Sequence, residues 1–308
     1  MNRRVVLIYN PKSSRACEVE REVLLPLRLL FPHGNLIEHK ISSQIFEENI
    51  TEISKVLHEN DIVISAGGDG TAAIASNAIL ATSHKNISIG YLGFGNFDDF
   101  AGVFTGRHKT IHDLIAHISH TVDTHPLEVL IDDKHLRFSV LYTTLGITAA
   151  SCDQFEDKSR RKTLARSKYK KLIYSLSVMI RFYFRVRRTY RITPYTLNEK
   201  SITRSTDFFA MNTPRSARIL RYRGELYRDP RNFLTTPRDF SRITNLASFM
   251  IKSFFGRMPG HVTDSATLVF DNPTELDIQS EGEHRHLKNV QKITIKKSTK
   301  HLNVIKLK

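Results

Sequence analysis

Cysteine is scarce in this sequence, and long apolar runs are missing. The two cysteines, Cys17 and Cys152, lie far apart and belong to no CxxC motif or Cys/His cluster with zinc spacing. A disulfide framework and a zinc module are therefore excluded, and we expect both residues to be thiols in a reducing compartment. The longest apolar-rich stretch, residues 172–184, is interrupted by serines and an arginine, so no run of ~20 apolar residues is present to span a membrane. The first apolar run is too short for a signal peptide, and we expect a cytoplasmic protein.

Glycine and proline are also modest in number, with 14 and 10 residues in a chain of 308. Collagen-like and low-complexity chains are thereby excluded. Hydrophobic residues make up 40% of the chain, which is enough for one large or two moderate domains. Acidic residues are outnumbered, with 31 Asp and Glu against 46 Lys and Arg and a formal net charge of +15. This excess predicts an anionic partner, and nucleic acid, an anionic membrane face and phosphorylated substrates all qualify.

The first 120 residues alternate short apolar runs with segments of helical periodicity. Residues 4–9, 61–66 and 87–92 are typical of strands buried on both faces, because each run is continuous and rich in β-branched residues. Helical segments are expected at 16–31, 46–57 and 71–80, with Pro26 kinking or splitting the first. Strict alternation of strand and helix predicts βαβ units and a parallel sheet. We assign residues 1–122 to this α/β domain.

The pattern changes at about residue 121 to short alternating strands separated by turn residues. The strands are expected at 127–131, 136–144, 266–270, 274–278, 290–295 and 302–307. The turn signals Asp132-Asp133 and Asp271-Asn272-Pro273 predict antiparallel pairing, so residues 123–295 form a β-rich, antiparallel sandwich-like domain. Helices are expected at 158–191 and 240–255 within it. The tail at about 296–308 is a candidate to return to the first domain.

The most informative segment is Ala66-Gly67-Gly68-Asp69-Gly70-Thr71, which lies between a buried strand and a helix start. Three glycines in four positions let the backbone approach a ligand closely, and the N–H groups that open a helix favour phosphate. Asp69 itself repels phosphate, which suggests that it orders water, a metal or an attacking hydroxyl. The alternative is a tight turn in which Asp69 is a helix cap and no ligand binds.

Two further loops follow buried strands in the same way. Asn10-Pro11-Lys12-Ser13-Ser14 closes the first strand, and Gly93-Phe94-Gly95-Asn96 closes the third. In a parallel sheet these loops share the carboxyl edge with the glycine turn, which is where open α/β sheets bind ligands. Three such loops on one edge are typical of a nucleotide site.

These segments, together with the Asp99-Phe100-Ala101 that follows, resemble the catalytic-domain family of diacylglycerol kinases, which includes bacterial lipid kinases and sphingosine and ceramide kinases. The resemblance covers almost the whole chain in order, and GGDGT is its most specific motif. It implies an N-terminal nucleotide-binding domain, a C-terminal β-rich domain, ATP and lipid meeting between them, and transfer of the γ-phosphate to a lipid hydroxyl. It also implies that Asp69 is essential for catalysis. The nucleotide-binding residues that it suggests are Asn10, Pro11, Lys12, Ser13, Ser14, Gly67, Gly68, Gly70, Thr71, Gly95 and Asn96.

Ser280-Glu281-Gly282-Glu283 resembles the acidic Asp-Gly-Glu turn of the same family. By this match Glu283 and, second to it, Glu281 are the catalytic carboxylates that activate the acceptor hydroxyl. Phosphoryl transfer needs such a carboxylate and a divalent cation on the phosphates, so ATP and Mg²⁺ are the expected cofactors. Taken alone, the same residues are more typical of an acidic hairpin turn exposed to water, and it is their order after the upstream motifs that favours the catalytic interpretation.

The chain departs from the family pattern at three places. Arg15 stands where the family has Gly after the Asn-Pro loop, and Phe94 stands where it has Thr. The acidic metal loop has no clear counterpart between Arg221 and Thr236, so the metal ligands are unknown and Asp229 is only a candidate.

Residues 158–191 contain 13 Lys and Arg and no Asp or Glu, with an apolar, aromatic-rich centre. This composition predicts a helix at the headgroup level of an anionic membrane surface, although a core-packed helix with a solvated basic face has the same pattern. Nucleic acid is the least favoured partner, since no RNA- or DNA-binding signature accompanies the charge.

The sequence as a whole predicts a peripherally membrane-associated lipid kinase that phosphorylates diacylglycerol or a related lipid. Two alternatives stay open: an NAD kinase, which shares GGDGT, and a catalytically inactive nucleotide or lipid sensor at the membrane. A homodimer is also open.

Overall fold

The computed structural model describes residues 3–13, 15–31, 34–95, 98–156, 177, 180–216 and 220–307. The chain forms two compact units. Unit 1 contains Met1–Pro126, Tyr227–Pro230 and Ser298–Lys308, and unit 2 contains Leu127–Leu226 and Arg231–Lys297. The short insertion at Tyr227–Pro230 was not expected from the sequence. It joins unit 1 because the fully buried Tyr227 ring packs on Phe104 at 5.2 Å and its hydroxyl accepts a hydrogen bond from Lys306 at 2.7 Å.

Unit 1 contains a six-stranded sheet in the order β2-β1-β3-β4-β18-β5. Its strands are β1 (Val5–Tyr9), β2 (Leu36–Lys40), β3 (Ile62–Gly67), β4 (Ser88–Gly93), β18 (Leu302–Ile305) and β5 (Thr121–Thr124). All neighbours pair in parallel except β18 and β5, which confirms the predicted parallel sheet. The apolar runs of β1 and β3 are buried throughout, because helices cover both faces of the sheet.

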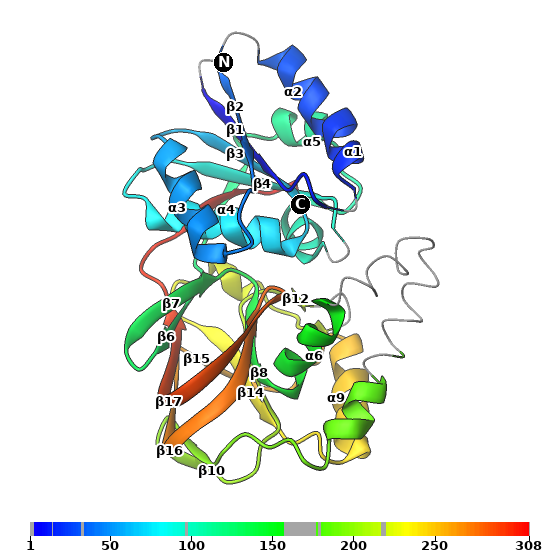
Figure 1. Ribbon diagram of the computed structural model, residues 1–308, viewed down its shortest axis with the longest axis vertical. Helices are drawn as coiled ribbons and strands as arrows, with labels where there is room; N and C mark the ends of the chain where they lie inside the picture. Colours follow the sequence, from blue (N-terminus) through cyan, green and yellow to red (C-terminus); the bar gives the residue numbers. More distant parts are fainter. Residues whose placement is uncertain are drawn as a thin grey trace. The chain divides into compact units, whose positions relative to one another are not determined.

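The covering helices divide between the two faces (Figure 1). One face packs against α1 (Ala16–Val19), α2 (Leu25–Leu30) and α5 (Ile111–Ala116), and the other against α3 (Phe46–Val56) and α4 (Asp69–Ala81). Between α1 and α2 the chain forms a π-helical stretch, Glu20–Leu24, directly before Pro26. The wider turn accommodates the residue that lacks an N–H, so the expected kink is a local widening of one continuous helical segment.

Unit 2 contains a ten-stranded antiparallel sheet, which confirms the predicted β-rich second part of the chain. Its strands are β6 (Leu127–Ile131), β7 (Lys134–Ser139), β8 (Tyr142–Gly146), β9 (Tyr195–Leu197), β10 (Lys200–Ile202), β11 (Asp207–Met211), β14 (Phe233–Arg238), β15 (His261–Thr263), β16 (Ser265–Ser280) and β17 (Glu283–Lys297). A separate small ribbon pairs β12 (Arg215–Ser216) with β13 (Leu220–Arg221).

Two strand boundaries differ from the sequence-based expectation. Residues 136–144 are not one strand, because the chain breaks between β7 and β8 at residues 140 and 141. Asp271-Asn272-Pro273 is not a turn: it lies inside β16, where the pairing with β17 shifts between Val269 and Thr274. Proline cannot donate to a ladder, and a bulge is one of the few places where a strand tolerates it.

The helices of unit 2 include α6 (Ile147–Glu156), the helical residues 180–186 and α9 (Ile243–Phe254), and a short 3-10 turn spans Leu226–Arg228. Most of the predicted basic helix, residues 158–176, lies outside the described residues. Within the described part of the chain, no helix has the length and apolar character needed to cross a membrane.

Candidate nucleotide-binding site

Three loops singled out in the sequence leave the same edge of the parallel sheet in unit 1. The strand ends are in register, since Tyr9 of β1 is the partner of Ala66 in β3 and Ala66 is the partner of Leu92 in β4. The chain continues from these strands into Asn10, Gly68 and Phe94. The carboxyl edge of the sheet therefore brings the Asn-Pro loop, the GGDGT turn and the second glycine loop side by side.

The two glycine loops touch backbone to backbone. The Phe94 N–H donates to the Gly67 carbonyl at 2.9 Å. A Cβ added to Gly95 would collide with the Cα of Gly68, so only glycine permits this approach. Gly68 is also the N-cap of α4 and has no side chain to accept from the N–H groups of the first turn. An anion can take that place at the positive end of the helix.

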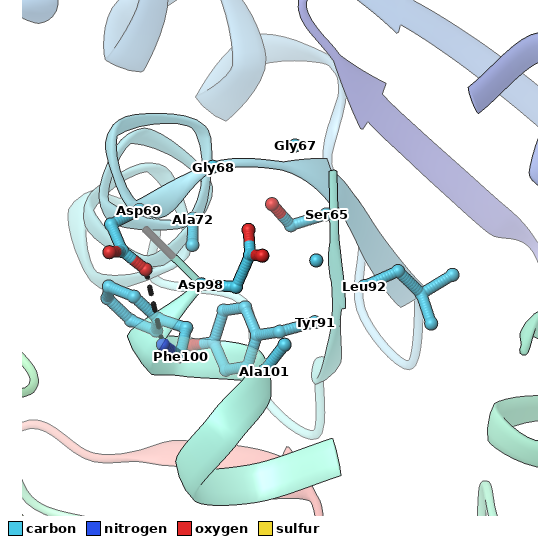
Figure 2. Close-up of a pocket in the computed structure, with 11 residues that line it drawn as sticks. Ser65, Gly67, Gly68, Asp69, Ala72, Tyr91, Leu92, Asp98, Phe100 and Ala101 are labelled. Atoms are coloured by element: carbon cyan, nitrogen blue, oxygen red, sulfur yellow. Dashed lines mark hydrogen bonds between the residues drawn. The ribbon is translucent and has the colours of Figure 1, made fainter. Parts of the chain in front are cut away.

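Asp69 is the first residue of α4, and its carboxylate is buried. Its Oδ1 accepts hydrogen bonds from the backbone N–H groups of Asp99 at 2.8 Å and Phe100 at 3.2 Å, as the dashed line in Figure 2 illustrates for Phe100. These N–H groups open the short helical segment 99–105, so Asp69 fastens the start of that segment to the GGDGT turn. Burial raises the pKa of Asp69 well above its ordinary value, and the nearby charges of Asp99 and Asp98 add to this effect.

A small cavity opens beside Asp69, between β3, β4 and the segment that begins at Asp98 (Figure 2). Its volume is about 10 Å³, which is room for roughly one water-sized group rather than for a nucleotide. Ser65 and Asp98 line it, and Asp98 Oδ1 accepts from the Gly95 N–H at 2.8 Å. The buried Ser65 hydroxyl has no hydrogen-bond partner among the described residues. A larger ligand would have to lie outside this cavity, along the loop edge.

The Asn-Pro loop is a tight turn held by its own asparagine. Asn10 Oδ1 accepts from the Lys12 N–H at 2.8 Å, and the Asn10 carbonyl accepts from the Ser13 N–H at 3.1 Å. Pro11 and the Lys12 side chain are exposed. The buried Ser13 hydroxyl finds no partner within the described ranges. Ser14 and Asn96, two further residues that the sequence suggested, lie outside the described residues.

The two departures from the family motif, Arg15 and Phe94, contact each other. The Arg15 guanidinium lies 5.1 Å from the centre of the Phe94 ring, and Arg15 Nη1 donates to the Gly93 carbonyl at 3.3 Å. Phe94 is itself part of the apolar core of unit 1. Arg15 is further held by Glu18, which accepts from its Nε at 2.9 Å. The arginine therefore bridges the Asn-Pro side of the site to the loop that follows β4.

The acidic turn predicted near the C-terminus belongs to unit 2 and connects β16 to β17. Glu281 and Gly282 both have positive φ, of 57° and 91°, as a two-residue hairpin turn requires. Glu281 is buried, and its Oε1 accepts from the Leu141 N–H at 2.6 Å and the Ser139 hydroxyl at 3.3 Å. Burial raises the pKa of Glu281 to about 7 despite these hydrogen bonds. Glu283 begins β17 and is half-buried, so it is the more accessible of the two predicted carboxylates.

A metal site is not evident among the described residues, where no three His, Cys, Asp or Glu side chains come together as a ligand set. Asp229, the candidate from the sequence, lies in the Tyr227–Pro230 insertion and hence in the same unit as the glycine loops. The charges of Asp98 and Asp99 act on Asp69, and the sequence analysis assigned neither of these residues a role in the site. The sequence feature that could have identified them is their position directly after the second glycine loop.

Comparison with known proteins identifies the first part of the chain. Residues 4–129 match the family model of the diacylglycerol kinase catalytic domain. Crystal structures of a diacylglycerol kinase and of a candidate diacylglycerol kinase from Bacillus anthracis strain Sterne share the fold, with TM-scores of 0.69 and 0.64. Their identities to this chain are 15% and 16%, and each alignment covers 98% of this chain and 96% of the other.

A third structure from the same strain, also a candidate diacylglycerol kinase, aligns over the same shares of both chains, at 16% identity and a TM-score of 0.68. At these identities the structures establish a shared fold alone. No curated protein sequence matches the chain. The family model of the diacylglycerol kinase catalytic domain matches a segment, residues 4–129, that contains all three loops of the candidate site.

Proposed function

We propose that this protein is a lipid kinase that transfers the γ-phosphate of ATP to a lipid hydroxyl, with diacylglycerol or a related lipid as the acceptor. The supporting observation is that the diacylglycerol kinase family match, residues 4–129, contains the strand ends at which three ligand-binding loops meet. Gly95 approaches the backbone of Gly68 closely, and both glycines are partly accessible to solvent, so no side chain stands between a phosphate and the N–H groups of these loops.

The residues at the loop edge fit a nucleotide bound together with a divalent cation. The N–H groups of the first turn of α4 and the exposed Lys12 supply positive potential for the phosphates. Asp69, Asp98 and Asp99 bring three carboxyl groups to the same place, and those that are ionised would repel a bare nucleotide. Their oxygens are the donor type that Mg²⁺ prefers, and the bound cation would neutralise charge on the transferred phosphate.

Of the two carboxylates predicted in unit 2, we propose Glu283 as the catalytic one and Glu281 as a positioning residue. Glu283 begins β17 with a half-buried side chain, which suits a group that must accept a proton from an acceptor hydroxyl. Glu281 is anchored by the backbone of residue 141, and we assign it the role of holding the hairpin turn in place. Asp69 has the corresponding role in unit 1, because it positions the segment 99–105 against the GGDGT turn.

Phosphoryl transfer can be tested with labelled ATP, Mg²⁺ and vesicles that contain diacylglycerol or other lipid alcohols. We expect a labelled phospholipid with the wild-type chain. Gly95→Ala should abolish the product, because its Cβ collides with the Gly68 backbone. Gly102→Ala is the matched control, since a Cβ there meets only the flexible end of Arg107. Asp69→Asn keeps a hydrogen-bond acceptor for the Asp99 and Phe100 N–H groups but removes a carboxylate that the proposed cation would use, so it should lose product while remaining folded.

Two other outcomes would contradict the proposal. Transfer of label to NAD, with none to lipid, would identify an NAD kinase. Binding of ATP or vesicles without any transfer would identify an inactive sensor, the alternative favoured by the replacement of the family threonine with the core residue Phe94.

We further propose that the enzyme reaches its lipid through the basic segment 158–191 on an anionic membrane surface. The described end of this segment, residues 180–191, has five arginines and no acidic residue. Each basic residue near an anionic leaflet contributes ~1 kcal/mol to binding.

A further inference from the structure

Helix α9 of unit 2 presents an apolar stripe to solvent. Ile243, Ala247, Ile251 and Phe254 are spaced by four, four and three residues and therefore lie along one side of the helix. Ile251 is 60% exposed and Phe254 is 55% exposed, and Phe255, directly after the helix, is 63% exposed. The stripe is separate from the face that packs inward through Phe249, which stacks on Phe209 at 5.3 Å.

The helical residues 180–186 lie beside α9 (Figure 1). The Tyr183 hydroxyl donates to the Phe240 carbonyl at 2.8 Å, and Arg187 Nη1 donates to the Ser241 carbonyl at 3.3 Å, just before α9 begins. Ile180 and Phe184 project from this second helix and are also exposed. We call Ile180, Phe184, Ile243, Ile251, Phe254 and Phe255 the α9 surface.

Cations surround the α9 surface. Residues 180–191 and 240–258 together contain eight Lys and Arg and no Asp or Glu. Two arginines lie directly over its aromatic rings, with the Arg221 guanidinium 5.5 Å from the centre of Phe254 and the Arg187 guanidinium 5.2 Å from the centre of Phe184. Exposed apolar side chains with guanidinium groups packed on them suit the boundary between the acyl and headgroup layers of an anionic leaflet.

We propose that the α9 surface is a membrane-insertion site, which buries its apolar side chains in an anionic bilayer while the surrounding arginines contact lipid phosphates. A second copy of the chain is the less suitable occupant, because a symmetric contact would place the same cations opposite one another. The proposal rests on the proposed function, since an enzyme that phosphorylates a lipid must meet its acceptor at a bilayer. The basic segment 158–191 was proposed to bind the membrane through its charge. The α9 surface would contribute apolar contacts from a different helix.

The absence of tryptophan from the chain allows a direct test of insertion. Phe254→Trp places a single fluorophore on the α9 surface, and Val262→Trp places one at a residue of β15 that is equally exposed, at 52%. With vesicles of phosphatidylcholine and phosphatidylglycerol, we expect the Phe254→Trp protein to show a blue-shifted emission that brominated acyl chains quench. The matched β15 variant should show neither change.

A binding assay completes the test. Ile251→Ser combined with Phe254→Ser should weaken sedimentation with the same vesicles about tenfold, whereas Val262→Ser combined with Val269→Ser should leave it unchanged. Unaltered emission from the fluorophore at position 254 while the chain binds vesicles would overturn the proposal. So would a serine variant that binds vesicles normally but dissociates a dimer. None of these readouts involves phosphoryl transfer, so insertion without kinase activity would refute the proposed function alone.

Discussion

At the residue scale, Arg15 and Phe94 show how a chain can replace two motif residues together. The family pattern has Gly and Thr at these positions, and here the guanidinium lies over the ring and donates to the Gly93 carbonyl. The aromatic ring joins the core of unit 1, and the arginine contacts both Gly93 at the end of β4 and Phe94 directly after it. Compared with the family motif, the sequence lacks a glycine and a threonine. The structure shows that the two residues in their place, Arg15 and Phe94, contact each other.

This contact predicts a role for Arg15 in nucleotide binding. Arg15→Ala should weaken ATP binding about tenfold, because it removes a cation–π contact and a hydrogen bond that fix the loop after β4. Fluorescent-nucleotide titration measures the dissociation constant. Arg21→Ala, an exposed arginine in the neighbouring π-helical stretch, is the control and should bind ATP as the wild type does. Equal affinities for the Arg15 variant and the wild type would show that the loop does not depend on this contact.

Glu281 predicts a pH dependence of stability. Burial raises its pKa from 4.5 to about 7 in the folded chain, so between these pH values the folded state holds a proton that the unfolded state has released. The free energy of unfolding should therefore fall as the pH rises from 4.5 to 7 and then level off. Glu281→Gln should remove up to about 3 kcal/mol of this decrease, since each pKa unit corresponds to ~1.4 kcal/mol.

Urea unfolding at pH 5 and pH 8 measures this difference. Glu275→Gln, on the exposed side of the same hairpin, should retain the wild-type dependence. Part of the decrease in the free energy of unfolding should persist in the Glu281 variant, because burial also raises the pKa of Asp207 to about 7. Asp207 accepts a hydrogen bond from the Thr148 N–H at the start of α6. A Glu281→Gln chain with an unchanged difference between the two pH values would show that this carboxyl group does not titrate in the window.

At the element scale, local patterns predicted the type of most segments but not their continuity. Asp271-Asn272-Pro273 has the composition of a turn, yet β16 runs through it. Along one edge, the first half of β16 pairs with β9 and the second half with β8, while the other edge pairs with β17 on both sides of the bulge. Pairing partners are distant in sequence, and residues 271–273 contain no information about them.

Asp69 shows that the local sequence also fails to identify the distant partners of a residue in the candidate site. Because Asp69 lies between a buried strand and a helix start, the sequence predicted that the turn binds a ligand. It also predicted that the Asp69 carboxylate interacts with a metal, a water or a hydroxyl. In the structure its carboxylate accepts from the N–H groups at the start of the segment 99–105. The carboxylate caps a helical segment, but this segment begins 30 residues away and is not the helix that Asp69 itself begins.

At the scale of the whole molecule, unit 1 depends on both ends of the chain. β18 lies between β4 and β5, and its Leu302, Val304 and Ile305 side chains are buried. The family-matched segment 4–129 lacks this strand, so it contains the nucleotide loops without one of the strands that complete their sheet. The last residues of the chain are thus part of the unit that carries the candidate site.

The position of β18 predicts a large difference between two neighbouring substitutions. Val304→Asp should lower the free energy of unfolding by about 4 kcal/mol or more, because it places an unpaired charge in the core. Asn303→Asp, on the half-exposed side of the same strand, should change it by only about 0.5 kcal/mol. Urea unfolding of the full chain compares the two. Similar losses for both variants would mean that β18 is not an integral strand of unit 1.

The sequence by itself determined the parallel α/β character of the first 120 residues, the β-rich character of the rest and the three loops of the candidate site, because side-chain periodicity and glycine-rich turns are local properties. Only the tertiary structure decided that Gly95 approaches Gly68, that Arg15 contacts Phe94, that β18 joins the first sheet and that α9 exposes an apolar stripe. Each of these depends on which distant segments pack together, and that is settled by burial and hydrogen bonding over the whole chain rather than by any short run of residues.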